Sequence, residues 1–457
     1  MMKLYRKIFI ALFICILFTQ NSYAITDKIK DKDKSKDVKV EYTNDIHSVF
    51  SLKDCIDIAI ERNPSIKSSI YNEQVYKSKI GQAWANFFPE ITAGFNVSRT
   101  SNKYSGNSPY MNMSYTMGYV PKLSADMLLF DFGKTKASAD YAKRMYESKK
   151  EDTKENINDI IYNIKYAYFN ILFAQAQVKV YEDTVKDYEM QLSQAKAFYD
   201  IGKKAKIDVV TAEYNLGKAQ LNLVKAKNVL QVANVELSKI MGIPEYTNYE
   251  LSDELTLNDF DETFENLIKM AYDVRPELVS SMKTVEAAKM NLRAKRRNYA
   301  PDLGIFGSYE YGISNQYNEN SGQVGVGLEY SALNIMKVKK QIDEAKAEYN
   351  KSLADYEDTK NTIYLNVKEN YLDLQTAKES IIIAKLALDE AKEQYRQVTG
   401  RYKAGVSDAI ELKDGENTYL NARLDFYNAM LNYNTTAASL EKEVGVPLKF
   451  SDKIILK

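Results

Sequence analysis

Four short segments of the chain alternate between apolar and polar residues. Apolar or aromatic residues occupy every second position over 91–97, 113–119, 303–311 and 324–330, with one glycine among them, and the intervening residues are mostly polar or glycine. A period of two residues predicts β-strands, and the spacing of the segments predicts two hairpins. One apolar face suits a barrel wall that faces lipid, although a sandwich strand in a soluble domain has the same pattern.

Turn-forming residues separate the two strands of each predicted hairpin. We expect a loop at Thr100–Asn112 in the first hairpin and a shorter one at Ser314–Gly322 in the second. Four strands are too few to close a barrel, for which about eight is the minimum, and an open edge in lipid leaves backbone groups unpaired. If the strands enter a membrane, several copies of the chain must therefore combine.

Two long segments carry a heptad repeat of apolar residues. Neither glycine nor proline occurs from Lys134 to Ile201, and the chain as a whole has only 18 Gly and 8 Pro. The first seam is Ile157, Ile164, Ile171, Val178, Val185, Leu192 and Tyr199, with Ile160, Ala167, Ala174, Tyr181, Tyr188 and Ala195 completing it. The second is Val367, Leu374, Ile381, Leu388, Tyr395 and Tyr402, completed by Ile363, Ala377, Ala384, Ala391 and Val398. These seams predict long antiparallel coiled-coil helices, each rising about 100 Å at about 1.5 Å per residue.

Helix-stop and helix-start residues predict the ends of the remaining helices. Each long helix is expected to turn at Gly202 or Gly405, and a second helix of roughly 38 residues then runs to a Gly-X-Pro sequence. Shorter helices are expected to start at the prolines of Asn63-Pro64 and Arg275-Pro276. They should run to Phe88 and Ala300, immediately before the strands.

The sequence contains an internal repeat of two similar units. Ala59, Pro64 and Pro89 recur as Ala271, Pro276 and Pro301, and residues of the later helices recur as the pairs Lys165 and Lys368, Tyr168 and Tyr371, Gly202 and Gly405, Gly242 and Gly445, and Pro244 and Pro447. Each copy has the order helix, hairpin, long helix, second helix. We therefore expect repeat 1 at residues 49–250 and repeat 2 at 251–457.

The N-terminus has the features of a cleaved secretory signal. Basic residues at positions 3, 6 and 7 precede an apolar run over 8–18, and Ser22-Tyr23-Ala24 supplies a cleavage site, so we expect a signal peptide at 1–24. The run is shorter than the roughly 20 residues of a membrane-spanning helix. A charged, flexible leader is expected at 25–48. Cys55 is then the one cysteine of the exported chain, so an intramolecular disulfide is excluded.

The residue inventory argues against an enzyme and against nucleic acid as a partner. The 62 basic and 62 acidic residues cancel, which leaves no excess charge for phosphates. His47 is the only histidine, so neither a histidine-based catalytic site nor a multi-histidine metal site is possible. There is no glycine-rich phosphate loop, and we expect no cofactor and no metal.

The order of these elements, with short motifs in both halves, resembles the TolC-like outer-membrane efflux proteins, also called outer-membrane factors. The motifs are Arg62-Asn63-Pro64, Phe87-Phe88-Pro89, Leu129-Phe130-Asp131-Phe132-Gly133 and Arg401-Tyr402-Lys403-Ala404-Gly405. The resemblance implies an α+β membrane protein in which four strands from each chain join a trimeric transmembrane β-barrel. It also implies a helical α-barrel next to the membrane barrel, in the periplasm. It further implies a periplasmic adaptor protein and an inner-membrane transporter as partners, with the barrel in outer-membrane lipid.

The same resemblance implies a periplasmic gate at the tips of the helical hairpins. Acidic residues line this constriction in the family, and the matching positions are Asp208, Glu411 and Asp414. Tyr402 matches a tyrosine that holds the closed state, and the tip turns at Gly202 and Gly405 match the adaptor contact. Ser407 departs from the arginine that some members use for closure. Converging carboxylates in a narrow pore would favour cations, although the same residues could simply face solvent.

We therefore predict that the protein is a passive exit duct of a tripartite efflux or type I secretion system, in which an inner-membrane pump drives export. A structural or adhesive surface coiled coil is the alternative; it explains the signal peptide and the heptads but not four amphipathic strands. The residues do not select between multidrug efflux, metal efflux and protein secretion.

Overall fold

A computed structural model describes residues 49–103, 113–245, 249–253, 257–260, 262–314, 318–330, 334–404, 406–448 and 451–454. The predicted signal peptide and leader, with His47, lie outside these residues, as do Gly405 and most of the first hairpin loop. Among the described residues, the first half contains α2 (Leu52–Arg62), α3 (Pro64–Ala85), β2 (Glu90–Lys103), β3 (Met113–Phe130), α4 (Lys134–Asp200) and α5 (Lys206–Met241). The second half contains α6 (Phe264–Val274), α7 (Pro276–Arg296), the 3₁₀ turn η1 (Arg297–Tyr299), β6 (Asp302–Ser314), β7 (Asn318–Glu329), α8 (Ile335–Lys403) and α9 (Ala409–Val444).

Two short pairs of strands connect segments that lie outside the helices and the hairpins. Strand β1 (Val49–Phe50) pairs in parallel with β4 (Glu250–Leu251), and β5 (Asn258–Asp259) pairs antiparallel with β8 (Ser451–Ile454). Both pairings join segments that are far apart in the sequence, and patterns within short windows do not indicate such pairings.

The helix boundaries follow the start and stop residues of the sequence. Helices α3 and α7 begin at proline, and the cap residues that follow α5 and α9 are Gly242 and Gly445, whose φ angles are +78° and +84°. Such left-handed backbone favours glycine, which ends the helix. Two predicted boundaries were wrong, because α3 stops at Ala85 and α7 at Arg296, each a few residues before the expected end. The second helices of the two hairpins have 36 residues each, close to the expected length.

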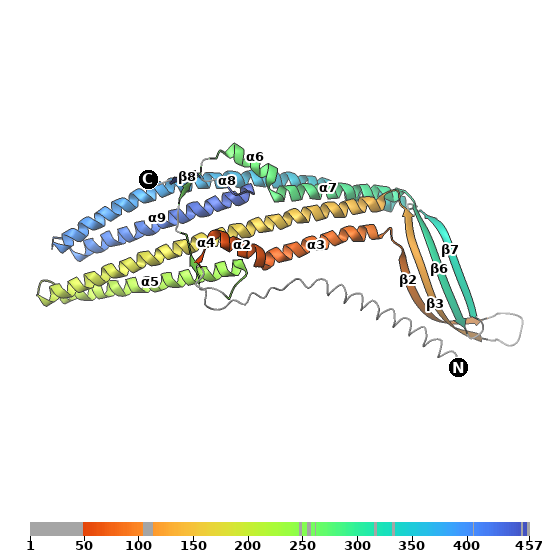
Figure 1. The fold of residues 1–457 in the computed structure, drawn as a ribbon, viewed down its shortest axis with the longest axis horizontal. Helices are drawn as coiled ribbons and strands as arrows, with labels where there is room; N and C mark the ends of the chain where they lie inside the picture. The colour runs from red at the N-terminus through yellow and green to blue at the C-terminus, as the bar shows by residue number, and fades with distance from the viewer. Residues whose placement is uncertain are drawn as a thin grey trace. The chain divides into compact units, whose positions relative to one another are not determined.

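The long helices α4 and α8 have 67 and 69 residues. Helix α4 contacts α5, and α8 contacts α9, so each pair forms a helical hairpin that extends away from the sheet (Figure 1). The predicted seams are buried at most positions, including Ile164, Ile171, Val367 and Ile381. Tyr199 was placed in the seam wrongly: it lies at the last turn of α4 and is 44% exposed, because the hairpin ends there and no facing turn covers it.

The four predicted strands form one antiparallel sheet with the order β2-β3-β6-β7. Register places residues such as Leu123 opposite Tyr309, and Ile305 opposite Val326, so their side chains share a face. That face is exposed and apolar in all four strands. The other face carries the ion pair of Lys122 with Glu310 at 2.6 Å. The predicted loops were too long, since β2 continues to Lys103 and β7 begins at Asn318.

Among the described residues, two large hydrophobic clusters lie beside the hairpins, and two smaller ones lie within them, around Val185 and around Leu412. One large cluster joins α2, α4 and α5 around Cys55, Ile164, Tyr168 and Leu237; the other joins α6 to α9 around Leu267, with Ile363, Tyr433 and Leu440. Each fully buried aliphatic side chain stabilises the packing by about 1.5–3 kcal/mol. The short helices α2 and α6 therefore hold the middle of each helical column.

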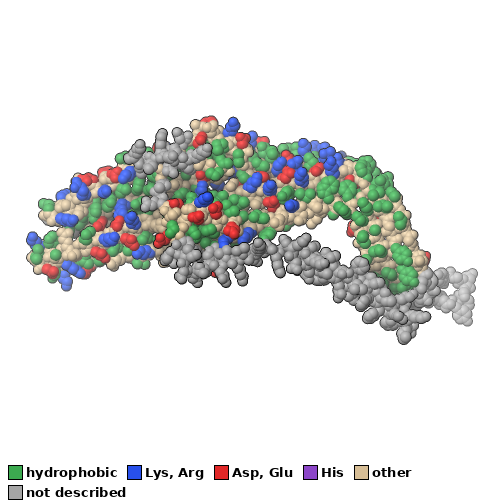
Figure 2. All heavy atoms as spheres, in the orientation of Figure 1, with side chains coloured by type: hydrophobic (Ala, Val, Ile, Leu, Met, Phe, Trp, Pro, Cys, Tyr) green, Lys and Arg blue, Asp and Glu red, His purple; other side chains and the backbone are tan. Residues whose placement is uncertain are grey.

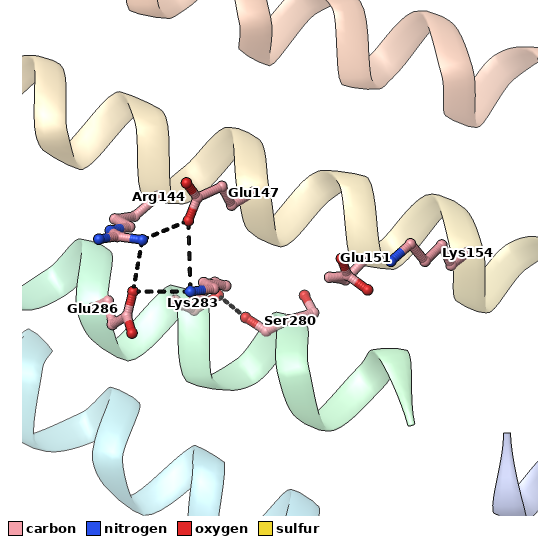
Figure 3. A network of polar contacts seen from close by, with 8 residues as sticks. Arg144, Glu147, Glu151, Lys154, Ser280, Lys283 and Glu286 are labelled. Atoms are coloured by element: carbon pink, nitrogen blue, oxygen red, sulfur yellow. Dashed lines mark hydrogen bonds and ion pairs between the residues drawn. The ribbon is translucent and has the colours of Figure 1, made fainter. Parts of the chain in front are cut away.

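Polar contacts join the two halves between α4 and α7. Arg144 lies 2.7 Å from Glu147 and 3.2 Å from Glu286, and Lys283 lies 3.3 Å from Glu286 (Figure 3). Because all four side chains are partly exposed, each pair is worth at most about 1 kcal/mol. Closer to the sheet, Arg297 donates to the carbonyl oxygen of Gly133, which connects the end of α7 to the start of α4.

Candidate functional site at the hairpin tips

The turn of the first hairpin follows from a glycine and an acidic cap. Gly202 has a φ angle of +70° and donates its N–H to the carbonyl of Tyr199 at 2.9 Å, closing the end of α4. Asp208 accepts the N–H of Ala205 at 3.1 Å, at the start of α5. In one chain, the predicted gate residue Asp208 is therefore a helix cap, in the position where a carboxylate is favoured by the helix dipole.

An acidic side chain also caps the helix after the second turn, but here it belongs to the residue that precedes the helix. Asp408 accepts the N–H of Glu411 at 2.8 Å and so caps α9. The carboxylate of Glu411 lies 2.6 Å from the guanidinium of Arg401 and accepts a hydrogen bond from Ser407. The predicted tip glycine, Gly405, lies outside the described residues. Glu411 thus closes its own turn, and Ser407 takes part through its hydroxyl.

Asp414 is the predicted gate residue with the least engaged side chain. It is exposed, and no side chain among the described residues donates to or pairs with its carboxylate. It follows Glu411 by three positions, so both carboxylates lie on one face of α9. The buried Leu412 lies on a different face, against Tyr402 and Val398.

Tyr402 and Lys204 connect the two hairpin tips within one chain. The ammonium group of Lys204 donates to the hydroxyl of Tyr402 at 3.0 Å and lies 4.3 Å from the centre of its ring. Tyr402 is only 7% exposed, which makes the contact more resistant to solvent than a surface pair. The structure therefore brings Tyr402 to the other hairpin, as a tie between tips requires, with a lysine as its partner.

Deeper between the hairpins lies a buried acidic cluster that sequence reasoning missed. Glu416 of α9 is 3% exposed, and its carboxylate accepts a hydrogen bond from Gln191 of α4 at 3.1 Å. One of its oxygens has no partner among the described residues. Burial raises the pKa of Glu416 to about 7, and burial also raises the pKa of the neighbouring Asp187.

A signal for this cluster was present in the sequence of α9. Residues at alternating spacings of four and three form its seam, namely Leu412, Glu416, Tyr419, Arg423, Phe426, Met430 and Tyr433. Glutamate and arginine occupy core positions of an otherwise apolar and aromatic pattern. Arg423 meets Asp183 of α4 at 2.8 Å. Charged residues at seam positions therefore indicated contacts between hairpins.

Two other kinds of feature are absent from the described residues. No helix there combines the length and apolar character needed to cross a membrane. No group of three or more histidine, cysteine or acidic residues is arranged there to hold a metal ion.

Comparison with known proteins gives a consistent picture. The family model described as "Outer membrane efflux protein" matches residues 55–243 and 267–446. The chain is 20% identical to the probable efflux pump outer membrane protein TtgC of Pseudomonas putida, covering 86% of this chain and 83% of that protein. It is 24% identical to the alkaline protease secretion protein AprF of Pseudomonas aeruginosa, covering 87% and 85%.

Solved structures share the fold. The CmeC outer membrane channel of Campylobacter jejuni superimposes with a TM-score of 0.74 at 17% identity, over 88% of this chain and 87% of that one. The MtrE outer membrane channel of Neisseria gonorrhoeae, in its open state, gives a TM-score of 0.69 at 20% identity, over 88% and 90%. With the family model matching both halves, from α2 to α5 and from α6 to α9, this chain belongs to the outer membrane efflux protein family.

Proposed function

We propose that the chain is the outer-membrane subunit of a tripartite efflux or type I secretion system and forms a passive exit duct. The observation that carries the proposal is a four-stranded sheet with one exposed apolar face, joined directly to two long helical hairpins. Relatives named for efflux and for protease secretion support both branches of this function. Energy would come from an inner-membrane transporter, and a periplasmic adaptor would connect the two.

The sheet supports a barrel built from several copies. Among the described strands, β2 and β7 each have one unpaired edge, which lipid cannot satisfy. Pairing β7 of one copy with β2 of the next closes a ring, and three copies give twelve strands, above the minimum of about eight. The exposed apolar face, with Phe95, Leu123 and Val326, would then contact lipid, and the face with Lys122 and Glu310 would line the duct.

Exposed apolar residues on the hairpins support the same trimer below the membrane. Helix α5 exposes Val210, Leu221 and Val224 at heptad-like spacing, and α8 exposes Leu365 and Leu372. Unpartnered stripes of this kind are typical of helices that pack against another chain. Helices from three copies would therefore enclose a periplasmic tunnel. The repeated order of elements fits an internal duplication, with repeat 1 at 49–250 and repeat 2 at 251–457.

The hairpin tips would form the periplasmic gate and the adaptor contact. In the trimer, Asp208, Glu411 and Asp414 from three chains would converge at the tunnel entrance and favour cations. Tyr402, held by Lys204, would keep the tips together in the closed state. The turns at Gly202 and Gly405 would present the tips to the adaptor.

Single-channel conductance in a planar lipid bilayer tests this function. The wild type should give a small, cation-selective conductance. The pair Glu411→Ala and Asp414→Ala should enlarge the conductance or reduce its selectivity, because it removes charge at the entrance. Glu357→Ala with Asp358→Ala, two exposed acids in the middle of α8, is the matched control and should change neither.

The possible failures of this experiment separate the channel from its gate. A conductance that the Glu411 and Asp414 substitutions leave unchanged would keep the duct and reject these gate residues. Protein that never inserts or conducts would contradict the duct itself and favour a passive surface coiled coil.

A further inference from the structure

A belt of exposed aromatic and apolar side chains surrounds the root of the sheet, where strands meet helices. It comes from the ends of α3, η1 and the strands, and from the start of α8: Trp84, Phe88, Phe130, Phe132, Tyr299, Tyr330, Ile335 and Met336 are each at least 41% exposed. Aromatic residues concentrate at the boundary between hydrocarbon and water in membrane barrels. If the sheet forms the membrane barrel proposed above, this belt marks its periplasmic boundary.

Basic residues lie immediately beyond the belt on its helical side. Arg293, Lys295 and Arg296 occupy the end of α7, and Lys337 and Lys339 the start of α8. At about 1.5 Å per residue, each lies within about 10 Å of the belt along its helix. Figure 2 shows Lys and Arg side chains gathered at the end of the helices nearest the sheet, beside its hydrophobic face.

These five cations are available to an external anion. No side chain of the five makes an ion pair or a hydrogen bond with another described residue, and all five residues are exposed except Lys295, which is half-buried. Two neighbours do not belong to the set, because Lys340 pairs with Asp343 at 3.3 Å and Arg297 donates to a backbone carbonyl. We call the five residues the basic root surface.

Helix electrostatics explain only part of the basic root surface. The partial negative charge at the end of α7 favours Arg293, Lys295 and Arg296. The start of α8 has partial positive charge, which disfavours Lys337 and Lys339, and its first turn has no acidic residue. The helix dipole therefore does not favour these two lysines, whereas an anion from outside would be attracted by their ammonium groups.

Carboxylates at the root of the sheet do not neutralise this surface. Glu90 lies opposite Asp126 in the sheet, and both belong to the polar face, since their neighbours Ile91 and Ala125 belong to the apolar one. Glu329 belongs to the polar face as well, opposite Asp302. The acids at the root of the sheet therefore lie on the face that would line the duct, where Asp302 pairs with Lys134 at 3.0 Å, and they leave the basic root surface without an ion pair.

We infer that the basic root surface binds the phosphate groups of anionic phospholipids in the periplasmic leaflet of the outer membrane. The aromatic belt sets the level of the headgroups, and Arg293, Arg296, Lys337 and Lys339 reach them from the aqueous side. Each basic residue near an anionic membrane surface contributes about a fivefold preference. The interaction anchors the barrel at a defined depth, next to the point where the helices leave the membrane.

Tryptophan fluorescence quenching by brominated lipids tests this inference. Trp84 is the only tryptophan, so Trp84→Phe with Tyr299→Trp moves the probe beside the basic root surface. This protein is reconstituted into phosphatidylcholine vesicles that contain either phosphatidylglycerol or phosphatidylcholine, brominated near the headgroup, at equal mole fraction. Quenching by the brominated phosphatidylglycerol should exceed quenching by the brominated phosphatidylcholine about twofold or more. At about 0.5 M salt the ratio should fall toward one.

The variant Arg293→Gln, Arg296→Gln, Lys337→Gln, Lys339→Gln should bring the ratio to one in low salt. A control with Lys218, Lys225, Lys239 and Lys392 changed to Gln removes the same charge from exposed positions far along the hairpins and should keep the high ratio.

Equal quenching by the two lipids in the parent protein would overturn the inference, while the duct would stand because the probe still meets lipid. A high ratio retained by the root variant would also overturn it. Absence of quenching by either lipid would instead contradict the membrane barrel itself. If the root variant does not fold, the salt dependence of the quenching ratio in the parent protein tests the inference instead: a ratio that stays high at about 0.5 M salt would overturn it.

Discussion

Replacing Glu416 by glutamine tests whether a buried acid weakens the packing between the two hairpins at neutral pH. Asp187, Tyr188 and Gln191 face Glu416 from α4, and Tyr395 lies beside them on α8. Burial is the main cause of its raised pKa, about 7 instead of 4.5, with a smaller contribution from the charge of Asp187. Glutamine keeps the shape and the hydrogen bonding but carries no charge at any pH.

The direction of the pH effect follows from proton binding. Between pH 4.5 and about 7, folded Glu416 holds a proton that the unfolded chain has released. The free energy of unfolding therefore falls as pH rises through this window and is constant above it. The difference between the two pKa values corresponds to about 3 kcal/mol, at about 1.4 kcal/mol for each pKa unit. Ionisation of Glu416 thus opposes hairpin packing at neutral and alkaline pH.

Urea unfolding of the detergent-purified protein, followed by the helical circular dichroism signal from pH 4 to 8, measures this effect. The wild type should lose about 3 kcal/mol more over this range than Glu416→Gln. The effect of Glu416 is the difference between the two proteins in how steeply the free energy of unfolding falls with pH. The pH dependence of the wild type alone does not isolate it, because burial also raises the pKa of Glu155 to about 7, which adds the same pH dependence to both proteins. Glu357→Gln, which removes an exposed charge, is the control and should follow the wild type. Equal slopes in the wild type and Glu416→Gln would refute the reasoning.

Three further predictions concern the core and the tips. Cys55 is fully buried, and its pKa is raised to about 12. Native protein should therefore not react with a thiol reagent at pH 8, whereas urea-unfolded protein should react fully. Mass spectrometry measures the extent of both reactions. Gly242→Ala should lower the free energy of unfolding by about 2–4 kcal/mol, because the backbone there is left-handed and an added Cβ would lie 2.9 Å from backbone atoms of Arg62. Gly202 is also left-handed but has open space around it, so Gly202→Ala should lower the same free energy by only about 1 kcal/mol. The same urea assay measures both. Tyr402→Phe removes the hydrogen bond from Lys204 but keeps the ring, so the channel should open more often in a bilayer, and an unchanged open probability would contradict a role in closure.

The elements themselves were predictable because their signals are local. Alternation of two residues over 91–97 and heptads over the glycine-free stretch from Lys134 to Ile201 are properties of short windows, and they specify which face of a strand or helix is apolar. Proline at the start of α3 and glycine at the end of α5 act through φ angles of single residues. The sequence by itself therefore determined four strands, two long hairpins and the location of the tips.

Contacts between distant segments were decided only by the tertiary structure. No pattern around Lys204 indicated Tyr402 as its partner, because the two residues are brought together by the packing of separate hairpins. The burial of Glu416, and with it its raised pKa, depends in the same way on Gln191 and its neighbours on α4. Asp208, which the resemblance assigns to the gate, is a helix cap within one chain. The solvation and charge state of a side chain depend on which surfaces pack against it. A sequence pattern indicates that one face of a helix or strand will be buried, but it does not specify which element buries it.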